Sequence, residues 1–256
     1  VVRVSADMDQ ETVSRVFAEY GLTVVPVVDA EGRMEGIVTV DDIVHVVRQE
    51  ATEDAQKFGG VEALDIPYLE STRRVMIRRR ARWLTVLLIG EMFTATALGF
   101  FEDDLIPILA LFLPLIISSG GNSGGQASTL VIRAMALGEV RTRDWFRVMR
   151  REILLGLALG TILGTCAALR VLIWGAAGAY DDQTSHYILI GLTVAFSVTG
   201  CVLWGTFAGS MLPFILRRFG ADPANASAPL VATLVDVSGI IIYFTVAKLF
   251  LSGILI

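Results

Sequence analysis

Five long apolar segments in the later part of the chain limit its fold more than any other feature. Each is long enough to cross about 30 Å of hydrocarbon, a distance that takes about 20 helical residues. Backbone polar groups find no partners in a bilayer core, so a spanning segment of this kind is helical. The predicted spans cover approximately residues 83–101, 105–136, 153–177, 187–216 and 226–256. The sequence therefore predicts an all-α membrane domain of five transmembrane helices.

The connectors around these spans alternate in charge. Arginines cluster before the first span, between the second and third, and between the fourth and fifth: Arg73, Arg74, Arg78, Arg79, Arg80 and Arg82; Arg141, Arg143, Arg147, Arg150 and Arg151; Arg217 and Arg218. The other two connectors, which include Glu102-Asp103-Asp104 and Asp181-Asp182, contain no basic residue. Because Lys and Arg concentrate in cytoplasmic loops, this pattern predicts a multi-pass protein of the cell membrane, inner or plasma. Its N-terminus would be cytoplasmic and its C-terminus extracytoplasmic.

Composition agrees with a membrane protein joined to a smaller polar part. The 256 residues are 54% apolar and 18% charged, whereas soluble domains are about 45–50% apolar and about 25% charged. Because the charge falls mainly in the first third, we predict a domain over 1–50, a connecting amphipathic helix over 51–82 and a pore domain over 83–256. The chain begins without methionine or a signal-peptide pattern, which indicates a piece of a longer polypeptide.

The first 50 residues predict a small α/β domain. A helical pattern over 10–20 precedes a β-branched run, a turn, a second strand over 34–40 and a further helix from Asp41 or Asp42. The stretch "LTVVPVVDAEGRMEGIVTVDDIV" resembles the second of a pair of CBS domains, which implies a missing partner domain. Some CBS domains bind adenine nucleotides through a Thr and an Asp spaced as Thr39 and Asp42 are. A Thr and an Asp at a strand-to-helix junction are more often a helix cap.

Span two contains an unusual polar run at membrane depth, "SSGGNSGGQ" over 118–126, shortly after Pro114. Glycine and proline loosen a helix, and freed backbone groups are tolerated in a bilayer where they line water. Their carbonyl oxygens and the amide oxygen of Asn122 are hard ligands of the kind that small cations prefer. The run therefore predicts a pore lining. The glycines could instead only permit close helix packing.

Span five places a carboxylate, Asp236, among apolar neighbours. A charge at mid-membrane costs about 2.5–3.5 kcal/mol on insertion scales and therefore indicates function. Helical spacing predicts a polar stripe made of Asp236 with Thr233, Gly239 and Tyr243, although such hydroxyls could also satisfy the carboxylate structurally. A second intramembrane acid, Glu91 in span one, could line the pore or face the bundle interior.

These residues resemble the MgtE-type magnesium transporters over essentially the whole chain. The matching stretches are "PLIISSGGNSGGQASTLVIRA", "GSMLPFILRRFGADPANASAPLVATLVDVSGIIIYF" and "EATED". The resemblance implies a homodimer with its pore on the symmetry axis and Asp236 as the principal ion ligand, assisted by the Ala232 carbonyl. Asn122 and Gly121 would lie further along the path. Family members often have Asn where this chain has Gly125, which removes a side-chain role at that position.

We therefore expect a channel that moves Mg²⁺ into the cytoplasm, with the lipid bilayer and a second copy of the chain as partners and no nucleic acid. Mg²⁺ requires near-octahedral oxygen and loses water reluctantly, so one or two carboxylates with retained waters suit it. A proton-coupled transporter of divalent cations, using Glu91 and Asp236 as a relay, is the main alternative. A membrane-anchored sensor is a weaker one, because an anchor needs no intramembrane acid. The sequence contains no enzyme constellation, and His45 and His186 lie far apart in it.

An acidic run at the domain junction predicts regulation by cytosolic Mg²⁺. Glu50, Glu53 and Asp54 precede the arginine-rich start of span one, and like charges crowded together favour a bridging divalent cation. Alone, such a run is usually a solvated helix face. The resemblance implies that regulatory Mg²⁺ is held by these three residues together with Asp42 and with Asp222 of the loop between spans four and five. It also allows ATP at the CBS domain of the full-length protein.

Overall fold

The computed structural model describes residues 2–64, 68–104, 106–178 and 186–254. The chain divides into two compact units, one ending at Gln56 and one containing the five long helices. A few residues of the following loop also group with the first unit. Each unit is described by itself.

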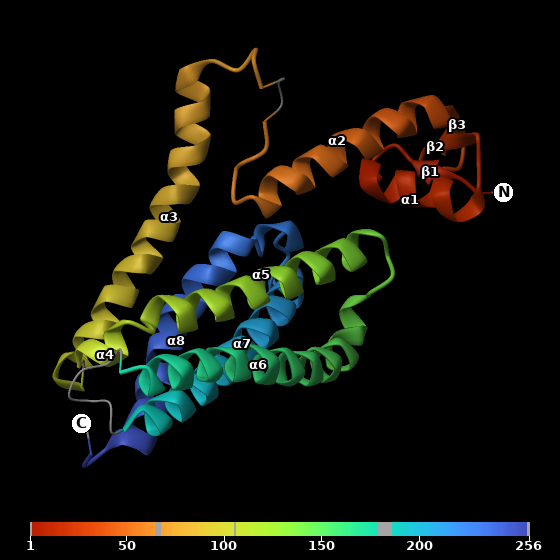
Figure 1. The fold of residues 1–256 in the computed structure, drawn as a ribbon. Helices are drawn as coiled ribbons and strands as arrows, with labels where there is room; N and C mark the ends of the chain where they lie inside the picture. Colours follow the sequence, from red (N-terminus) through yellow and green to blue (C-terminus); the bar gives the residue numbers. More distant parts are fainter. Residues whose placement is uncertain (1, 65–67, 105, 179–185, 255–256) are drawn as a thin grey trace. The chain divides into compact units, whose positions relative to one another are not determined.

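The first unit is a small α/β domain with a three-stranded sheet. Its elements are β1 (Val4–Ser5), α1 (Gln10–Tyr20), β2 (Val24–Val28), β3 (Met34–Thr39) and α2 (Val40–Phe58). The sheet order is β1-β2-β3, with β1 parallel to β2 and β2 antiparallel to β3 (Figure 1). Apolar side chains from the sheet and both helices form its core: Val4, Val13, Phe17, Val25 and Ile43. This confirms the predicted α/β unit and adds β1, which is too short for a periodic pattern.

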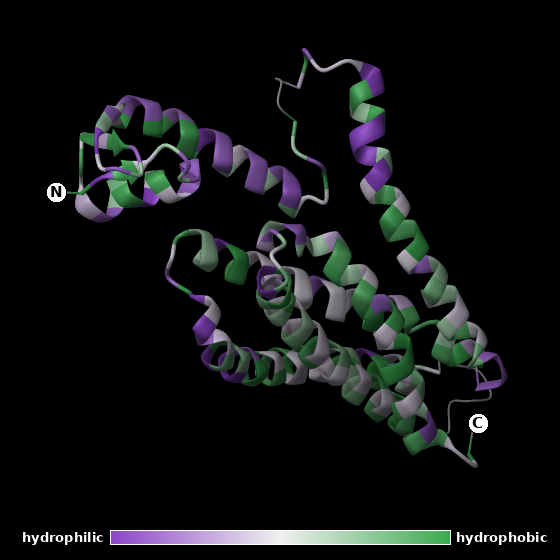
Figure 2. Cartoon of the chain, turned by 180° about the vertical axis from the view of Figure 1, so that it is seen from behind, coloured by the Kyte–Doolittle hydropathy of each residue, from purple (hydrophilic) through white to green (hydrophobic). Residues whose placement is uncertain are grey.

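The predicted connecting helix over 51–82 is wrong as a single helix. Helix α2 ends at Phe58 and α3 (Arg73–Gly99) begins only after a connecting segment. The break follows from Gly59-Gly60, because Gly60 adopts a φ of +68°, a left-handed conformation that ends helices. Figure 2 shows the polarity change: the last turns of α2 and the first turns of α3 are hydrophilic, and the rest of α3 is mainly hydrophobic.

The second unit contains five helices that are long and apolar enough to cross a membrane. After α3 its elements are η1 (Glu102–Asp104), α4 (Pro107–Ala110), α5 (Leu113–Ala136), η2 (Thr142–Asp144), α6 (Trp145–Ala176), α7 (Tyr187–Arg218), η4 (Pro223–Asn225) and α8 (Ala228–Leu251). This confirms the five predicted spans. Helix α6 starts about two turns earlier than predicted, because its arginine-rich beginning is helical although it is not apolar.

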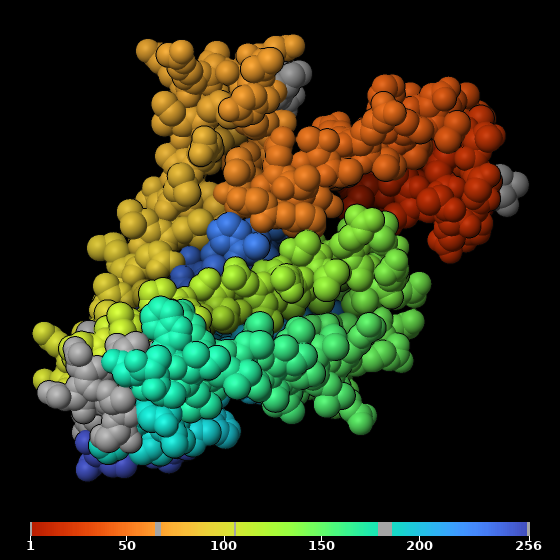
Figure 3. Space-filling model, in the orientation of Figure 1, coloured from red at the N-terminus to blue at the C-terminus, as the bar shows by residue number. Residues whose placement is uncertain are grey.

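Helix α7 is the packing centre of this unit, since α5, α6 and α8 all lie against it. The core is formed by large buried side chains that include Leu109, Ile116, Ile190, Tyr243 and Phe244. Helix α3 is different, because Ala97 is the only buried residue within its described length. On the face seen in Figure 3, α8 (blue) is visible between α3 (yellow) and α5 (yellow-green).

Candidate cation-binding groove

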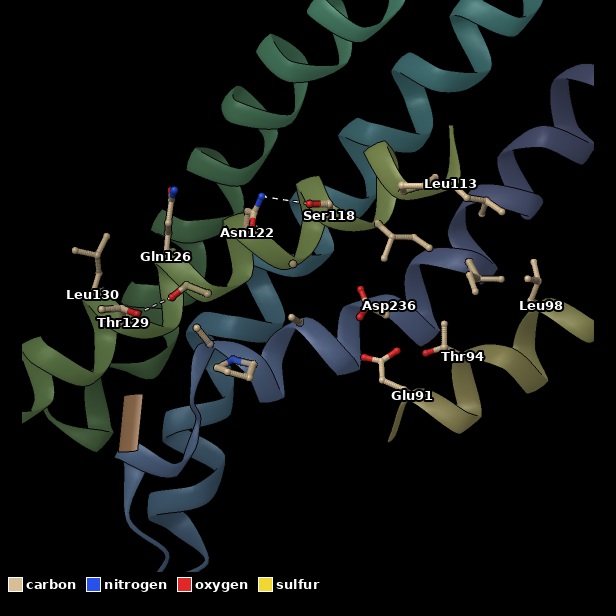
Figure 4. Close-up of a pocket in the computed structure, with 18 residues that line it drawn as sticks. Glu91, Thr94, Leu98, Leu113, Ser118, Asn122, Gln126, Thr129, Leu130 and Asp236 are labelled. Atoms are coloured by element: carbon tan, nitrogen blue, oxygen red, sulfur yellow. Dashed lines mark hydrogen bonds between the residues drawn. The ribbon is translucent and has the colours of Figure 1, made fainter. Parts of the chain in front are cut away.

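Helices α3, α5 and α8 line an open groove of about 1260 Å³. Its polar lining comes from all three helices (Figure 4): Glu91, Thr94, Ser118, Asn122, Gln126, Thr129 and Asp236. Gly121, Gly125 and Ala232 line it as well, so the four predicted pore positions Asp236, Ala232, Asn122 and Gly121 share one groove. Among its described lining residues there is no Lys or Arg. The groove therefore presents oxygen atoms and negative charge.

The glycines of α5 divide between two faces of the helix. Gly124 packs against α7, where a Cβ in its place would lie 2.7 Å from the Gly205 carbonyl oxygen. Gly120 makes a similar approach to Cys201, and a Cβ on Gly209 would lie 2.1 Å from the Gly124 oxygen. Gly121 instead faces α8 on the groove side, with Ala232 at ordinary contact distance. Close packing and groove lining thus belong to different glycines of the same run.

The expectation that this run loosens the helix is wrong. Helix α5 is continuous from Leu113 to Ala136, and Pro114 lies in its first turn, where proline is tolerated. The Gly125 carbonyl even accepts a bond of 2.8 Å from the Thr129 hydroxyl. Inside a continuous helix, the Gly121 and Ala232 carbonyls already accept helical N–H groups and offer a cation or water only their second lone pair. The side-chain oxygens that the run brings to the groove belong to Ser118, Asn122 and Gln126, and the Asn122 amide donates to Ser118 Oγ at 3.4 Å.

Of the predicted stripe on α8, only Asp236 lines the groove. The Tyr243 hydroxyl is buried and donates to the Leu109 carbonyl at 2.9 Å, while Gly239 packs near Cys201. Thr233 donates its hydroxyl to Glu91 Oε1 at 3.2 Å. The threonine and tyrosine hydroxyls of this stripe are therefore engaged elsewhere, which disfavours a purely structural role for Asp236. The predicted stripe does not line the groove as a unit, because Thr233 bonds to α3, Gly239 packs against α7 and Tyr243 bonds to α4.

Glu91 faces the groove, which settles the position that the sequence left open. Figure 4 shows its carboxylate directed toward that of Asp236, with Thr94 beside them. Thr94 and Thr129 are polar groove residues that sequence reasoning missed. Thr94 follows Glu91 by three positions, so helical spacing alone could have placed both on one face.

The predicted regulatory residues do not form a metal cluster in this structure. Within the described residues, no three His, Cys, Asp or Glu side chains are grouped so that they could hold a metal ion. Asp222 pairs with Lys57, with 2.5 Å between Oδ2 and Nζ, and it accepts the Ala224 N–H at 2.9 Å. Glu50 accepts a bond from Gln10 at 2.7 Å.

Thr39 and Asp42 form a helix cap. Both the backbone N–H and the hydroxyl of Thr39 donate to Asp42 Oδ2, at 3.2 and 2.8 Å. In this arrangement a side chain of the first helical turn accepts a hydrogen bond from the backbone N–H of the residue that precedes the helix. These bonds lower the pKa of Asp42 below its ordinary value of 3.8, the side-chain bond contributing most. The geometry explains the motif without a nucleotide.

Comparison with known proteins assigns this chain to a family. A family model described as a divalent cation transporter, MgtE, matches residues 113–246, and a CBS domain model matches 1–49. A magnesium transporter MgtE from Thermus thermophilus is 43% identical over 256 residues, 99% of this chain and 54% of the relative. One from Bacillus subtilis is 34% identical over 253 residues, 98% of this chain and 53% of the relative. The chain spans about half the length of these relatives. It belongs to the MgtE family of divalent cation transporters.

Proposed function

We propose that the groove carries Mg²⁺ across the membrane into the cytoplasm. The observation that carries this proposal is Asp236, a carboxylate inside a membrane-spanning helix, which faces a groove with no basic lining residue among those described. An octahedral shell of six waters at about 30 Å³ each needs roughly 180 Å³. A groove of about 1260 Å³ therefore has room for a largely hydrated ion. The curated relatives are named magnesium transporters, which supports Mg²⁺ as the cargo.

The proposal includes a homodimer. Helix α3, which forms one wall of the groove, is exposed along nearly all of its described length, with large apolar side chains such as Leu88, Met92 and Phe93 on its surface. One chain thus offers a half-pathway and an apolar helix beside it. A second copy related by a two-fold axis would bring a second Asp236 to the path and supply two carboxylates to a hydrated Mg²⁺, an arrangement that this ion accepts.

The test is Mg²⁺ uptake into liposomes by the purified protein and by Asp236→Ala. The variant is expected to lose uptake while it elutes like the parent in size-exclusion chromatography, because it removes the one charged oxygen that α8 brings to the groove. Asp103→Ala is the matched control, since Asp103 is an exposed acid outside the groove. Unchanged uptake by Asp236→Ala would rule out this groove as the pathway.

Proton-coupled transport of divalent cations is the second candidate. It is favoured by one observation, the presence of two carboxylates, Glu91 and Asp236, in the same groove. Uptake measured with and without an imposed proton gradient separates the two candidates. A channel is expected to give the same Mg²⁺ flux in both conditions once the membrane potential is clamped, whereas a coupled transporter would stop when the gradient is removed.

We also propose a cytoplasmic N-terminus, an extracytoplasmic C-terminus and regulation by cytosolic Mg²⁺ through Asp42, Glu50, Glu53, Asp54 and Asp222. The orientation is supported by the arginines at the start of α3 and the end of α7. Lys248 near the end of α8 departs from this pattern but is paired with Asp104, 2.7 Å away. ATP remains a candidate ligand of the CBS domain in the full-length protein, with Thr39 and Asp42 as its expected contacts.

A further inference from the structure

Two close helices bring Glu91 to the groove. Gly90 of α3 meets Thr233 of α8 so closely that a Cβ on Gly90 would lie 2.3 Å from Thr233 Cγ2. The next residue, Glu91, therefore reaches α8 and accepts the Thr233 hydroxyl at 3.2 Å. A bond of this kind fixes which way the Glu91 carboxylate points, and in Figure 4 it points toward Asp236.

A third oxygen adjoins the two acids. The Thr94 hydroxyl is buried and has no hydrogen-bond partner within the described part of the chain. Its residue lines the groove, and Figure 4 shows it next to Glu91 and Asp236. A buried hydroxyl without a partner costs free energy, so a water or a hydrated ion at this point would satisfy it.

The charge of this part of the groove is not balanced by protein cations, since none of its described lining residues is basic. Two ionised carboxylates at membrane depth are costly unless protons or metal cations neutralise them. One divalent cation neutralises both, whereas one monovalent cation leaves a carboxylate uncompensated. The arrangement therefore favours a divalent ion over a monovalent ion at the same place.

We propose that Glu91 is a specificity-determining residue of the pathway: a second carboxylate, oriented by Thr233, that acts with Asp236 to select divalent over monovalent cations. This inference rests on the proposed transport function and adds to it a residue from a different helix. Asp236 remains the principal ligand. Glu91 acts through the water shell of the ion and through its charge.

The test compares the purified protein with Glu91→Gln, Glu91→Asp and Thr233→Val in liposomes, with Glu102→Gln as the matched control outside the groove. Two quantities are measured: the Mg²⁺ concentration for half-maximal uptake, and the ratio of Mg²⁺ to Na⁺ flux. For Glu91→Gln, the half-maximal concentration is expected to rise about tenfold or more, equivalent to about 1.4 kcal/mol. The flux ratio is expected to fall. Glu91→Asp should restore both values in part, and Thr233→Val should shift both in the same direction as Glu91→Gln but less.

The outcomes separate this inference from the proposed function. If the parent moves no Mg²⁺, the transport function itself fails. If Asp236→Ala is inactive while Glu91→Gln and Thr233→Val keep the parental concentration dependence and flux ratio, transport stands and the role of Glu91 is overturned. If Glu91→Gln does not fold, Thr233→Val decides, because it keeps the carboxylate and removes only the hydroxyl that orients it. A parental flux that depends on a proton gradient, with that dependence lost in Glu91→Gln, would make Glu91 a proton carrier and would also overturn the proposal.

Discussion

At the residue scale, Asp42 illustrates how one carboxylate can serve a local structure while remaining a candidate ligand. Its Oδ2 accepts two bonds from Thr39 at the start of α2. Such a cap satisfies donors that the first helical turn leaves free. A ligand that binds Asp42 through Oδ2 would have to share that oxygen with the cap, whereas one that binds through Oδ1 would leave both cap bonds in place.

The cap predicts a pH dependence at the start of α2. The pKa of Asp42 is lowered in the folded protein, so its stabilising contribution is fully present above the unfolded value near 3.8 and is lost as the pH falls through the folded value. We expect the parent to protect the amides of the first α2 turn from hydrogen exchange more than Asp42→Asn does at pH 6. This difference should disappear well below pH 3.8. A difference in protection that stays constant across this range would contradict the assignment of the charged form to the cap.

The residues of the groove could be predicted from the sequence only in part. Asp236 and Asn122 stood out because a carboxylate and an amide are rare inside apolar spans. The partner of Glu91 could not be predicted, because it depends on the crossing of α3 and α8 at Gly90 and Thr233, which are far apart in the sequence. The sequence also contained no sign that Asp222 pairs with Lys57, which lies 165 positions away.

At the element scale, the glycines of α5 lie on two faces of the helix: one face packs against α7 and the other lines the groove. On the face that packs against α7, the two backbones come into close contact. Gly124 of α5 contacts Gly205 and Gly209 of α7 in this way. Helix α6 packs on α7 in the same manner through Gly156, Gly160 and Gly164. Small residues of this kind allow membrane helices to approach closely. The side of α5 that carries Gly121 and Gly125 lines the groove.

The packing predicts which glycine substitutions α5 tolerates. Gly124→Ala places a Cβ 2.7 Å from the Gly205 oxygen and should force α5 and α7 apart, with a loss of about 1–3 kcal/mol, typical of overpacking. Gly121→Ala, whose Cβ would meet Ala232 at 3.4 Å, should leave the melting temperature in detergent nearly unchanged. Gly99→Ala, with nothing within 4 Å, is the control for helix propensity. Equal melting temperatures for all three variants would contradict the close contact of α5 with α7.

Hydropathy predicted the helices well because a bilayer span must be long, apolar and internally hydrogen-bonded. Hydropathy did not predict correctly where the helices are interrupted. The glycine run of α5 was expected to be loose, yet packing against α7 keeps it helical, and the interruption falls before Leu113 instead. The break after Phe58 could have been predicted from Gly59-Gly60, a turn signal that the amphipathic pattern obscured.

At the scale of the whole molecule, the alternating loop charge predicts a topology. In a protein whose native Cys166 and Cys201 are replaced by alanine, a cysteine at Asp103 should react with a membrane-impermeant maleimide added to intact cells. A cysteine at Arg143 should react only after permeabilisation, because arginine-rich connectors remain cytoplasmic. The predicted outer connector with Asp181 and Asp182 lies outside the described residues, so Asp103 is the better probe of that side. Labelling of both positions from the same side would contradict the five-span topology.

Regulation is the second prediction at this scale, and the end of α2 gives it a physical basis. Lys57 Nζ lies 2.5 Å from Asp222 Oδ2, and the adjacent Phe58 packs with Ile132, Ala224 and Ala226. The loop that carries Asp222 leads into α8, which carries Asp236. A divalent cation that binds Asp222 must therefore compete with a lysine ammonium, and its binding would act on the segment that leads into α8.

Two variants that change this charge balance in opposite directions should shift closure in opposite directions. Neutralising the acids together, as Glu53→Gln with Asp54→Asn and Asp222→Asn, is expected to leave Mg²⁺ conduction intact and to raise the cytosolic Mg²⁺ concentration that closes the channel. Lys57→Gln keeps every acid and removes the competing ammonium, so it should lower that concentration. Single-channel recording of the full-length protein at stepped cytosolic Mg²⁺ measures both. If neither variant changes the Mg²⁺ concentration that closes the channel, the acidic run is a solvated surface and the Lys57–Asp222 pair is a structural contact. If both variants raise that concentration, the proposed competition between Lys57 and a divalent cation is wrong.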